Sequence, residues 1–305
     1  MSTSTIPAAP ISSVKPVVVP VPGRPAPLLA RVTAPLHGER LPVVVLSHGN
    51  GWSMDGYAPL AEHWAGAGFV VVQPTHLDSR AGGLGHDDPA FSDVWRWRIA
   101  DLTAVLDHLD VVEAALPGLA GRVDRERVAI AGHSWGAQTA GALLGAGVLS
   151  ADGALEESFA DPRVRAGVLL AATGTGDSLT PFAAEHLPFM RPAYAQLTTP
   201  TLVVTGDADD SALSTRGPDW FTDAYHLSPG AEALLTLSGG EHSLGGVVGH
   251  EVAETTDASP ERVALVQRVT TAWLRFRLGL DDAAWPAAVA DVRRTGAGIG
   301  DLTTR

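Results

Sequence analysis

Residues 128–144 read VAIAGHSWGAQTAGALL, and this stretch decides the fold. The apolar run 128–131 precedes Gly132-His133-Ser134-Trp135-Gly136, and small residues follow at 137–144. The pattern G-x-S-x-G between a strand and a helix is typical of a sharp turn that lifts a serine clear of a sheet. We therefore predict that Ser134 is a nucleophile. The alternative is a tight turn in which the glycines only allow close packing of helix and sheet.

The chain around this stretch repeats one unit, in which a short apolar run leads through a polar turn into a helical segment. Such alternation predicts a mostly parallel sheet covered by helices on both faces. Prolines around residues 17–21 and 28–32 predict antiparallel edge strands there. The expected strands are 41–46, 69–72, 128–131, 164–171, 201–205 and 233–237, and the expected helices are 58–67, 93–116, 134–149, 260–278 and 282–292.

We expect one domain over residues 15–280, since no repeat or low-complexity linker divides the chain. Residues 1–14 are rich in Ser, Thr and Pro and are expected to be flexible. The insertion 174–199 lacks strand character and is long enough for a small lid. Residues 281–305 are expected to form a helical tail with a fraying Gly/Thr-rich end.

A serine hydroxyl needs a neighbouring base to act as a nucleophile. His242 is the best candidate, because it lies in a loop just after the predicted strand 233–237, at the sheet edge where ligands of α/β proteins bind. The alternative is an ordinary surface histidine. His133 lies inside the serine turn, where we expect it to pack or to line a pocket.

The acid that orients the base should follow a strand between Ser134 and His242. Strand 201–205 runs into Gly206-Asp207-Ala208-Asp209-Asp210, which offers three carboxylates. We favour Asp209, which lies far enough from Gly206 to turn back toward the sheet edge, over Asp207 and then Asp210. In this order His242 would take the proton of Ser134, and Asp209 would hold the imidazole tautomer.

A reaction through a tetrahedral anion needs two hydrogen-bond donors for the oxygen that becomes charged. One should be the backbone N–H of Trp135, directly after the serine. The other should come from the turn Ser47-His48-Gly49-Asn50-Gly51, which follows the first predicted central strand. Within this turn we favour the N–H of Asn50, with that of Gly49 second.

Composition excludes several classes of partner. The 305 residues carry 21 Lys and Arg against 34 Asp and Glu, a net charge of −13, whereas nucleic acids and anionic membranes need clustered positive charge. There is no cysteine, which excludes disulfides, thiolate metal sites and a cysteine nucleophile. No long apolar stretch or signal peptide is visible, so we expect a cytoplasmic protein without membrane insertion. The oligomeric state is left open.

With these motifs, the chain resembles serine hydrolases of the α/β-hydrolase superfamily. Its pattern is most similar to bacterial members related to platelet-activating-factor acetylhydrolases, chlorophyllases and dienelactone-hydrolase-like esterases. Dienelactone hydrolases use cysteine where this chain has Ser134. The resemblance implies the α/β-hydrolase fold and a carboxylic ester hydrolase that works through an acyl-enzyme, without metal or organic cofactor.

The substrate is less well defined by the sequence. The short insertion and the acidic charge favour small to medium uncharged esters. The same residues could serve acyl transfer, perhydrolysis or amide cleavage, and the fold could also carry a non-catalytic binding protein. Besides His133, the side chains expected to line the substrate pocket, which could equally be packing residues, are Trp52, Phe182, Phe189 and Leu244.

Overall fold

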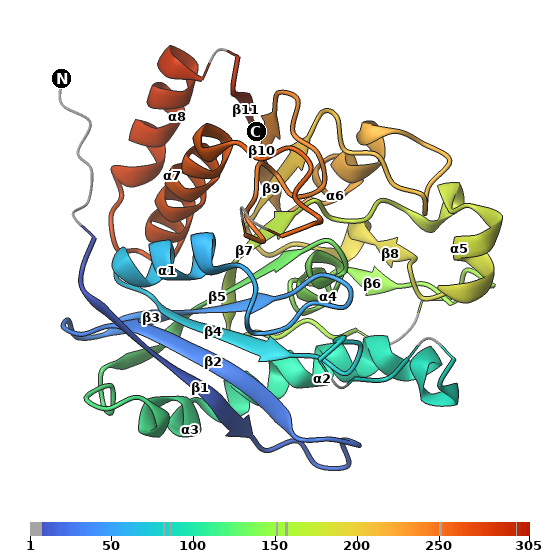
Figure 1. Ribbon diagram of the computed structural model, residues 1–305. Coiled ribbons are helices and arrows are strands. Elements are labelled where there is room, and N and C mark those ends of the chain that lie inside the picture. Colours follow the sequence, from blue (N-terminus) through green and yellow to red (C-terminus); the bar gives the residue numbers. More distant parts are fainter. Residues whose placement is uncertain are drawn as a thin grey trace.

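The computed structural model has one central sheet of nine strands with helices on both faces (Figure 1). The structure describes residues 8–81, 83–85, 87–150, 152–155, 158–249, 252–296 and 298–305. The strands of the sheet are ordered β1-β2-β4-β3-β5-β7-β9-β10-β11. Their bounds are β1 Ile11–Val19, β2 Leu28–Pro35, β3 Leu41–Ser47, β4 Val70–Thr75, β5 Val123–His133, β7 Val164–Leu170, β9 Thr201–Gly206, β10 Ala231–Leu237 and β11 Gly300–Thr304.

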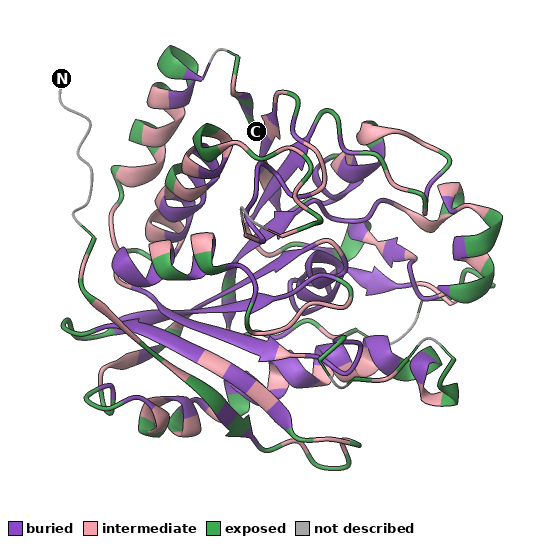
Figure 2. Ribbon diagram, viewed as in Figure 1, coloured by how far each residue is buried: buried purple, intermediate pink, exposed green. Residues whose placement is uncertain are grey.

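The six strands from β4 to β10 in this order run parallel, as the alternation of strands and helices predicts. They are buried along nearly their whole length, because helices cover both faces (Figure 2). The strands β1 and β2 extend one edge in antiparallel fashion. This sheet confirms the α/β-hydrolase fold expected from the sequence.

One face of the sheet is covered by α1 and α7, which also contact each other, and the other by α2 and α4. The Trp64 indole on α1 donates a hydrogen bond to Thr270 on α7, at 3.1 Å. The Trp273 indole on α7 donates to the carbonyl of Gly167 on β7. The helix bounds are α1 Ala58–Gly66, α2 Val94–Asp107, α3 Leu109–Ala115, α4 Trp135–Leu143, α5 Pro181–His186, α6 Asp223–Leu227, α7 Pro260–Arg277 and α8 Ala284–Thr295.

Two expected helices differ from the structure. The helix expected over 93–116 breaks at His108, whose backbone leaves the helical region (φ −116°, ψ 39°), and continues as the separate helix α3. The helix expected over 134–149 ends at Leu143, and Gly145 adopts a φ of +111° soon after. The chain then forms the short strand β6 (Gly147–Val148), which pairs with β8 (Pro192–Ala193) in the insertion. Apolar periodicity therefore located these helices but did not locate their ends.

The ends of the chain are more ordered than expected. Strand β1 begins at Ile11, inside the segment 1–14 that we expected to be flexible; residues 1–7 lie outside the described part. The tail contains the expected helix as α8, but its last residues do not fray. They form β11, which pairs antiparallel with β10 and is the outermost strand at the second edge of the sheet. The insertion 174–199 contains α5, β8 and two short 3₁₀ helices.

Candidate active site

The turn that carries Ser134 joins β5 to α4. Ser134 has φ 56° and ψ −124°, a conformation that L-residues rarely adopt. A Cβ at Gly132 would lie 2.0 Å from the carbonyl oxygen of Gly136, and one at Gly136 would lie 2.2 Å from that of Ser47. Both neighbours of the central three residues must therefore be glycine for the turn to form, as the motif requires.

Ser134, His242 and Asp209 come together at the carboxyl ends of their strands. His242 Nε2 lies 2.8 Å from Ser134 Oγ. On the other side of the ring, Nδ1 lies 3.0 Å and 3.2 Å from the two carboxylate oxygens of Asp209. The Asp209 side chain is fully buried, whereas that of His242 is 42% exposed, so solvent reaches the base but not the acid. Burial raises the pKa of Asp209, and the hydrogen bond from His242 acts against that shift.

The other two carboxylates of this loop have different surroundings. Asp207 Oδ1 accepts a hydrogen bond from the backbone N–H of Gly239 at 2.6 Å, and so ties the loop after β9 to the turn after β10. Asp210 is exposed. Of the three carboxylates weighed from the sequence, Asp209 is therefore the one that meets His242.

The backbone N–H groups of Asn50 and Trp135, both near Ser134, have no hydrogen-bond acceptor among the described residues. Both belong to the donors expected from the sequence, and Asn50 is exposed. Gly49 differs, because its N–H donates to the hydroxyl of Tyr57 at 2.9 Å. The single hydrogen of this N–H is therefore already engaged within the protein, so Asn50 stays the donor we favour in this turn.

Arg98 lies beneath residues 48–51, which we call the oxyanion loop after the role that the sequence predicts for them. Its guanidinium is fully buried and forms a two-pronged ion pair with Asp78, with N–O distances of 2.8 Å and 2.9 Å. It also donates to the carbonyl oxygens of His48, at 3.0 Å, and Gly49, at 3.3 Å. The guanidinium carbon lies 4.6 Å from the centre of the Trp135 ring. One buried cation thus contacts both segments that present an unpaired N–H.

A second Ser–His–Asp arrangement lies behind the oxyanion loop. Ser47 Oγ is 2.9 Å from His76 Nε2, and His76 Nδ1 is 2.9 Å from the carboxylate of Asp101. Asp101 is also paired with Arg24, at 2.7 Å. The side chains of His76 and Asp101 are fully buried. The backbone N–H of His76 donates to His48 Nε2, which connects this cluster to the oxyanion loop.

The residues expected to line the substrate pocket have different positions. Phe189 stacks on Trp135 with ring centres 5.1 Å apart and is buried. Leu244 is also buried, and Trp52 is half-buried against Tyr57. These three therefore act at least in part as packing residues.

The other two residues expected to line the pocket are Phe182 and His133. Phe182 is 62% exposed on α5, and its ring packs against that of His186, its neighbour on the same helix. His133 is buried, and both of its ring nitrogens are engaged, with the Tyr57 hydroxyl and with the carbonyl oxygen of His242. Phe182 therefore faces solvent, and the polar atoms of the His133 ring are all bonded within the protein.

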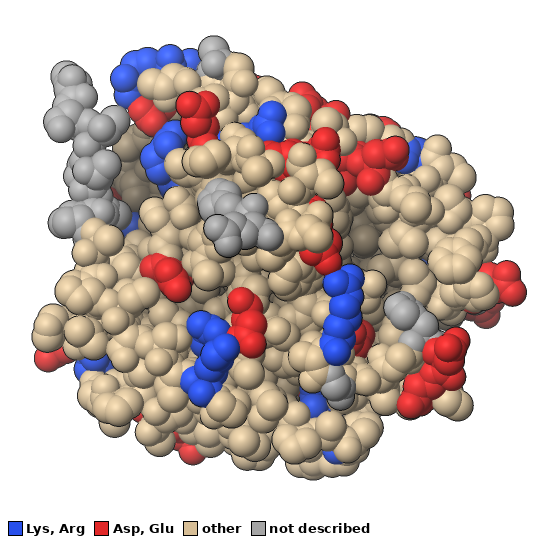
Figure 3. All heavy atoms as spheres, in the orientation of Figure 1, with Lys and Arg blue, Asp and Glu red and all other residues tan. Residues whose placement is uncertain are grey.

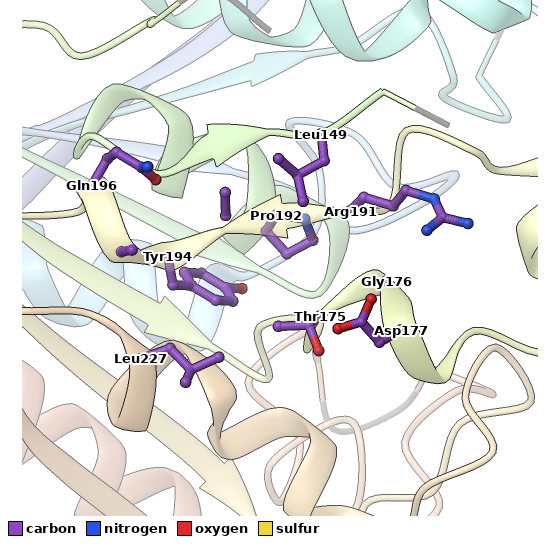
Figure 4. A pocket seen from close by; sticks show the side chains of 11 residues that line it. Leu149, Thr175, Gly176, Asp177, Arg191, Pro192, Tyr194, Gln196 and Leu227 are labelled. Atoms are coloured by element: carbon purple, nitrogen blue, oxygen red, sulfur yellow. The ribbon is translucent and has the colours of Figure 1, made fainter. Parts of the chain in front are cut away.

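Two hollows border this end of the sheet. One of about 370 Å³ is lined by Asn50, Asp78 and Arg80, and so reaches the oxyanion loop. Another of about 270 Å³ lies between the insertion and α6, where Tyr194, Arg191 and Leu227 form its walls (Figure 4). Ser134 and His242 line neither of these two hollows. Acidic and basic side chains are scattered over the face shown in Figure 3, without a continuous basic patch.

Sequence reasoning missed Arg98, Asp101, Asp78 and Tyr57. A signal existed for the first two, because both occupy the buried face of α2 among Ile99 and other apolar residues. A charged residue on an apolar helix face must find a partner inside the protein. Asp78 and Tyr57 lie in polar loops, where no comparable pattern marks them.

Among the described residues, no group of three or more His, Asp or Glu side chains is arranged to hold a metal ion. Within the same part of the chain, every helix is too short or too polar to cross a membrane.

Comparison with known families adds one finding. A family model described as Chlorophyllase matches residues 9–152, a range that contains the oxyanion loop and Ser134. Comparison with curated proteins gives no match. The family match supports a hydrolase of the esterase type in general terms. The chain has the α/β-hydrolase fold and, over residues 9–152, is similar to the Chlorophyllase family.

Proposed function

We propose that the chain is a serine hydrolase that cleaves carboxylic esters through an acyl-enzyme. The observation that carries this proposal is the continuous hydrogen-bonded arrangement from Asp209 through His242 to Ser134. It ends in Ser134, which lies on a strained turn and is partly exposed. An activated hydroxyl, an oriented base and a buried acid are the parts that nucleophilic acyl transfer needs.

In the first half of the reaction, Ser134 Oγ attacks the ester carbonyl carbon while His242 Nε2 takes the hydroxyl proton. The carbonyl oxygen becomes an anion that accepts hydrogen bonds from the N–H groups of Asn50 and Trp135. Collapse of this intermediate breaks the bond to the alkoxy group, and His242 returns the proton to the departing alcohol. Asp209 stabilises the imidazolium that exists between these steps.

In the second half, water replaces the alcohol. His242 takes a proton from water, whose oxygen attacks the acyl carbon. The bond from that carbon to Ser134 Oγ then breaks, His242 returns the proton to Ser134, and the carboxylic acid is released. The same two N–H groups hold the second anion. Each such donor contributes about 3 kcal/mol to stabilisation of the transition state.

Small to medium uncharged esters are the substrates that this site favours. His242 is 42% exposed, and the insertion nearby contributes only one six-residue helix, which supports an open site rather than a deep, lidded one. Asp209 and Asp257 both lie beside the loop that carries His242, and the chain as a whole has a net charge of −13. Anionic esters are disfavoured by repulsion from this field.

The proposal is tested with p-nitrophenyl acetate and butyrate. We expect hydrolysis by the wild-type protein, with a burst of p-nitrophenol when the acyl-enzyme accumulates. Ser134→Ala should abolish both the burst and the turnover. Full activity in that variant would refute the proposal, and a panel with alcohol, peroxide and amide acceptors separates hydrolysis from the other acyl transfers.

A further inference from the structure

Three hydrogen bonds connect the oxyanion loop to the loop of the base, beneath Ser134. The backbone N–H of Gly49 lies 2.9 Å from Tyr57 Oη, which lies 2.9 Å from His133 Nδ1. His133 Nε2 lies 2.7 Å from the carbonyl oxygen of His242. Tyr57 is fully buried and His133 is 4% exposed, so water does not compete for these groups.

The groups at the two ends determine which atom donates in each of these three hydrogen bonds. The carbonyl of His242 can only accept, so His133 Nε2 must carry a hydrogen. Burial lowers the pKa of His133 to about 3, so the ring is neutral and Nδ1 is an acceptor. The Tyr57 hydroxyl therefore donates to Nδ1, and its oxygen accepts the hydrogen of Gly49. Every N–H and O–H donor in this series of hydrogen bonds therefore has an acceptor.

The backbone around the chain is built to accommodate it. Tyr57 adopts a left-handed conformation (φ 65°) at the start of α1, and its own N–H donates to the carbonyl of Val248, in the segment after His242. A Cβ at Gly49 would lie 3.1 Å from Tyr57 Oη and 3.4 Å from Ser134 Cβ. Glycine at this position lets the tyrosine hydroxyl approach the loop directly behind the nucleophile. A non-glycine residue with positive φ persists only where its surroundings hold it there.

We propose that Tyr57 and His133 form a positioning relay that fixes the distance between the oxyanion loop and the base loop across Ser134. The relay rests on the proposed function, because its role is to hold Asn50 N–H and His242 in register around one reacting carbonyl. It uses up the N–H of Gly49, which leaves that of Asn50 for the substrate. Because the relay is neutral and reaches no solvent, it does not take part in proton transfer. Neither residue touches the substrate, so both act through the groups they hold.

The relay is tested first with Tyr57→Phe, which keeps the ring and removes the hydroxyl. Since misplacement of reacting groups by about 1 Å can cost a factor of 10² in rate, we expect kcat to fall about 10- to 100-fold with KM changed less than about threefold. The matched control is Tyr194→Phe, which removes another fully buried hydroxyl, bonded to the carbonyl of Thr173, outside the relay. We expect a similar loss of thermal stability in both variants but unchanged kcat in the control. Equal kcat in the two variants would overturn the relay.

A double-mutant cycle distinguishes the relay from two independent structural roles. His133→Gln keeps an amide N–H that can reach the carbonyl of His242 but has no acceptor at the position of Nδ1, where Tyr57 donates. Either change interrupts the same series of hydrogen bonds. The kcat of the double variant Tyr57→Phe/His133→Gln should therefore be no more than about twofold below that of the less active single variant. Losses that multiply would contradict a single relay.

Failure of the relay can be told apart from failure of the proposed function. If the wild-type protein hydrolyses no ester, the proposed function fails, and the relay is then judged by the ¹⁵N chemical shifts of the His133 ring. The relay requires a neutral ring with hydrogen on Nε2 between pH 5 and 8. A ring protonated on Nδ1 in that range would refute the relay whatever the catalytic outcome.

Discussion

Two Ser–His–Asp arrangements lie on neighbouring strands of this sheet, and they differ mainly in surroundings. In one, Ser134 meets His242 at 2.8 Å, and in the other Ser47 meets His76 at 2.9 Å. The distances from histidine to carboxylate are 3.0 Å and 2.9 Å. The His242 side chain is 42% exposed, whereas that of His76 is completely buried. Equal hydrogen-bond geometry thus occurs at a site that can be reached and at one that cannot.

The comparison shows which features a reacting site needs beyond the three side chains. Ser134 lies on a turn with positive φ beside two unpaired N–H groups, whereas Ser47 ends an extended strand in the core. The acid also differs. Asp101 is already paired with Arg24, so its carboxylate is less able to stabilise a positive charge on His76. We therefore expect the first arrangement to do chemistry and the second to hold the oxyanion loop in place.

The largest expected effect comes from replacing the two histidines. His242→Gln should lower kcat for p-nitrophenyl butyrate by about 10⁴- to 10⁶-fold, since it removes the base. His76→Gln should lower kcat by no more than about tenfold, because the His76 side chain bonds Ser47 and Asp101 and touches neither Ser134 nor the donors of the oxyanion loop. It should instead lower the free energy of unfolding by about 1–3 kcal/mol, measured in urea, as buried partners lose their bonds. Similar losses of kcat in both variants would contradict the view that only the arrangement around Ser134 does chemistry.

The next effect concerns the acid. Asp209→Asn should lower kcat by about 10⁴-fold, because the amide no longer holds the imidazole tautomer or stabilises its charge. The matched variant is Asp207→Asn, two residues earlier in the same loop, whose amide oxygen can still accept the Gly239 N–H. We expect its kcat to stay close to that of the wild type. A larger loss of kcat in Asp207→Asn than in Asp209→Asn would show that Asp209 is not the acid of the site.

The buried cluster should be more important for stability than for chemistry. Arg98→Met leaves Asp78 buried without its cation and should lower the free energy of unfolding by about 3–5 kcal/mol. The control is Arg125→Met, whose ion pair with Glu113 lies at the surface and should contribute less than about 1 kcal/mol. Chemical denaturation of the two variants measures this difference. Equal stability in the two would show that Arg98 does not hold the oxyanion loop.

The smallest effect is a pH dependence of stability. Burial lowers the pKa of His133 to about 3 and holds those of His48 and His76 well below their usual range. The unfolded chain therefore binds protons first, so stability is present above pH 6.5 and is lost as pH falls toward the folded-state values. Each histidine contributes about 1.4 kcal/mol per pH unit in this window. His76→Gln should remove one such contribution from the slope of unfolding free energy against pH, and an unchanged slope would contradict its neutral burial.

Much of the fold followed from local patterns. The continuous apolar strands required coverage on both faces, and the sheet has that form, with the expected antiparallel strands at one edge. The break at His108 was not visible, because the apolar spacing continues across it. The pairing of β11 with β10 was not visible either, since the short run Gly300–Thr304 is held only by a strand far away in sequence.

The candidate site divides in the same way. Ser134, Asp209 and His242 each follow a strand and could be found from local motifs alone. The hydrogen bond of the Gly49 N–H was not visible, because its partner, Tyr57, comes from the start of a helix and carries no motif. The exposure of Phe182 was not visible either, because an aromatic residue in an insertion can face solvent as easily as a pocket. Support of a site by distant polar groups depends on tertiary contacts that spacing does not encode.

Covalent labelling with a fluorophosphonate tests the central claim most directly, because the probe reacts only with a serine that is both activated and reachable. The intact protein is treated with the probe, and the modified peptide is located by mass spectrometry. We predict one adduct per chain, on Ser134, which is lost in Ser134→Ala and unaffected by Ser47→Ala. An adduct on Ser47, or no adduct on a folded wild-type chain, would contradict the account.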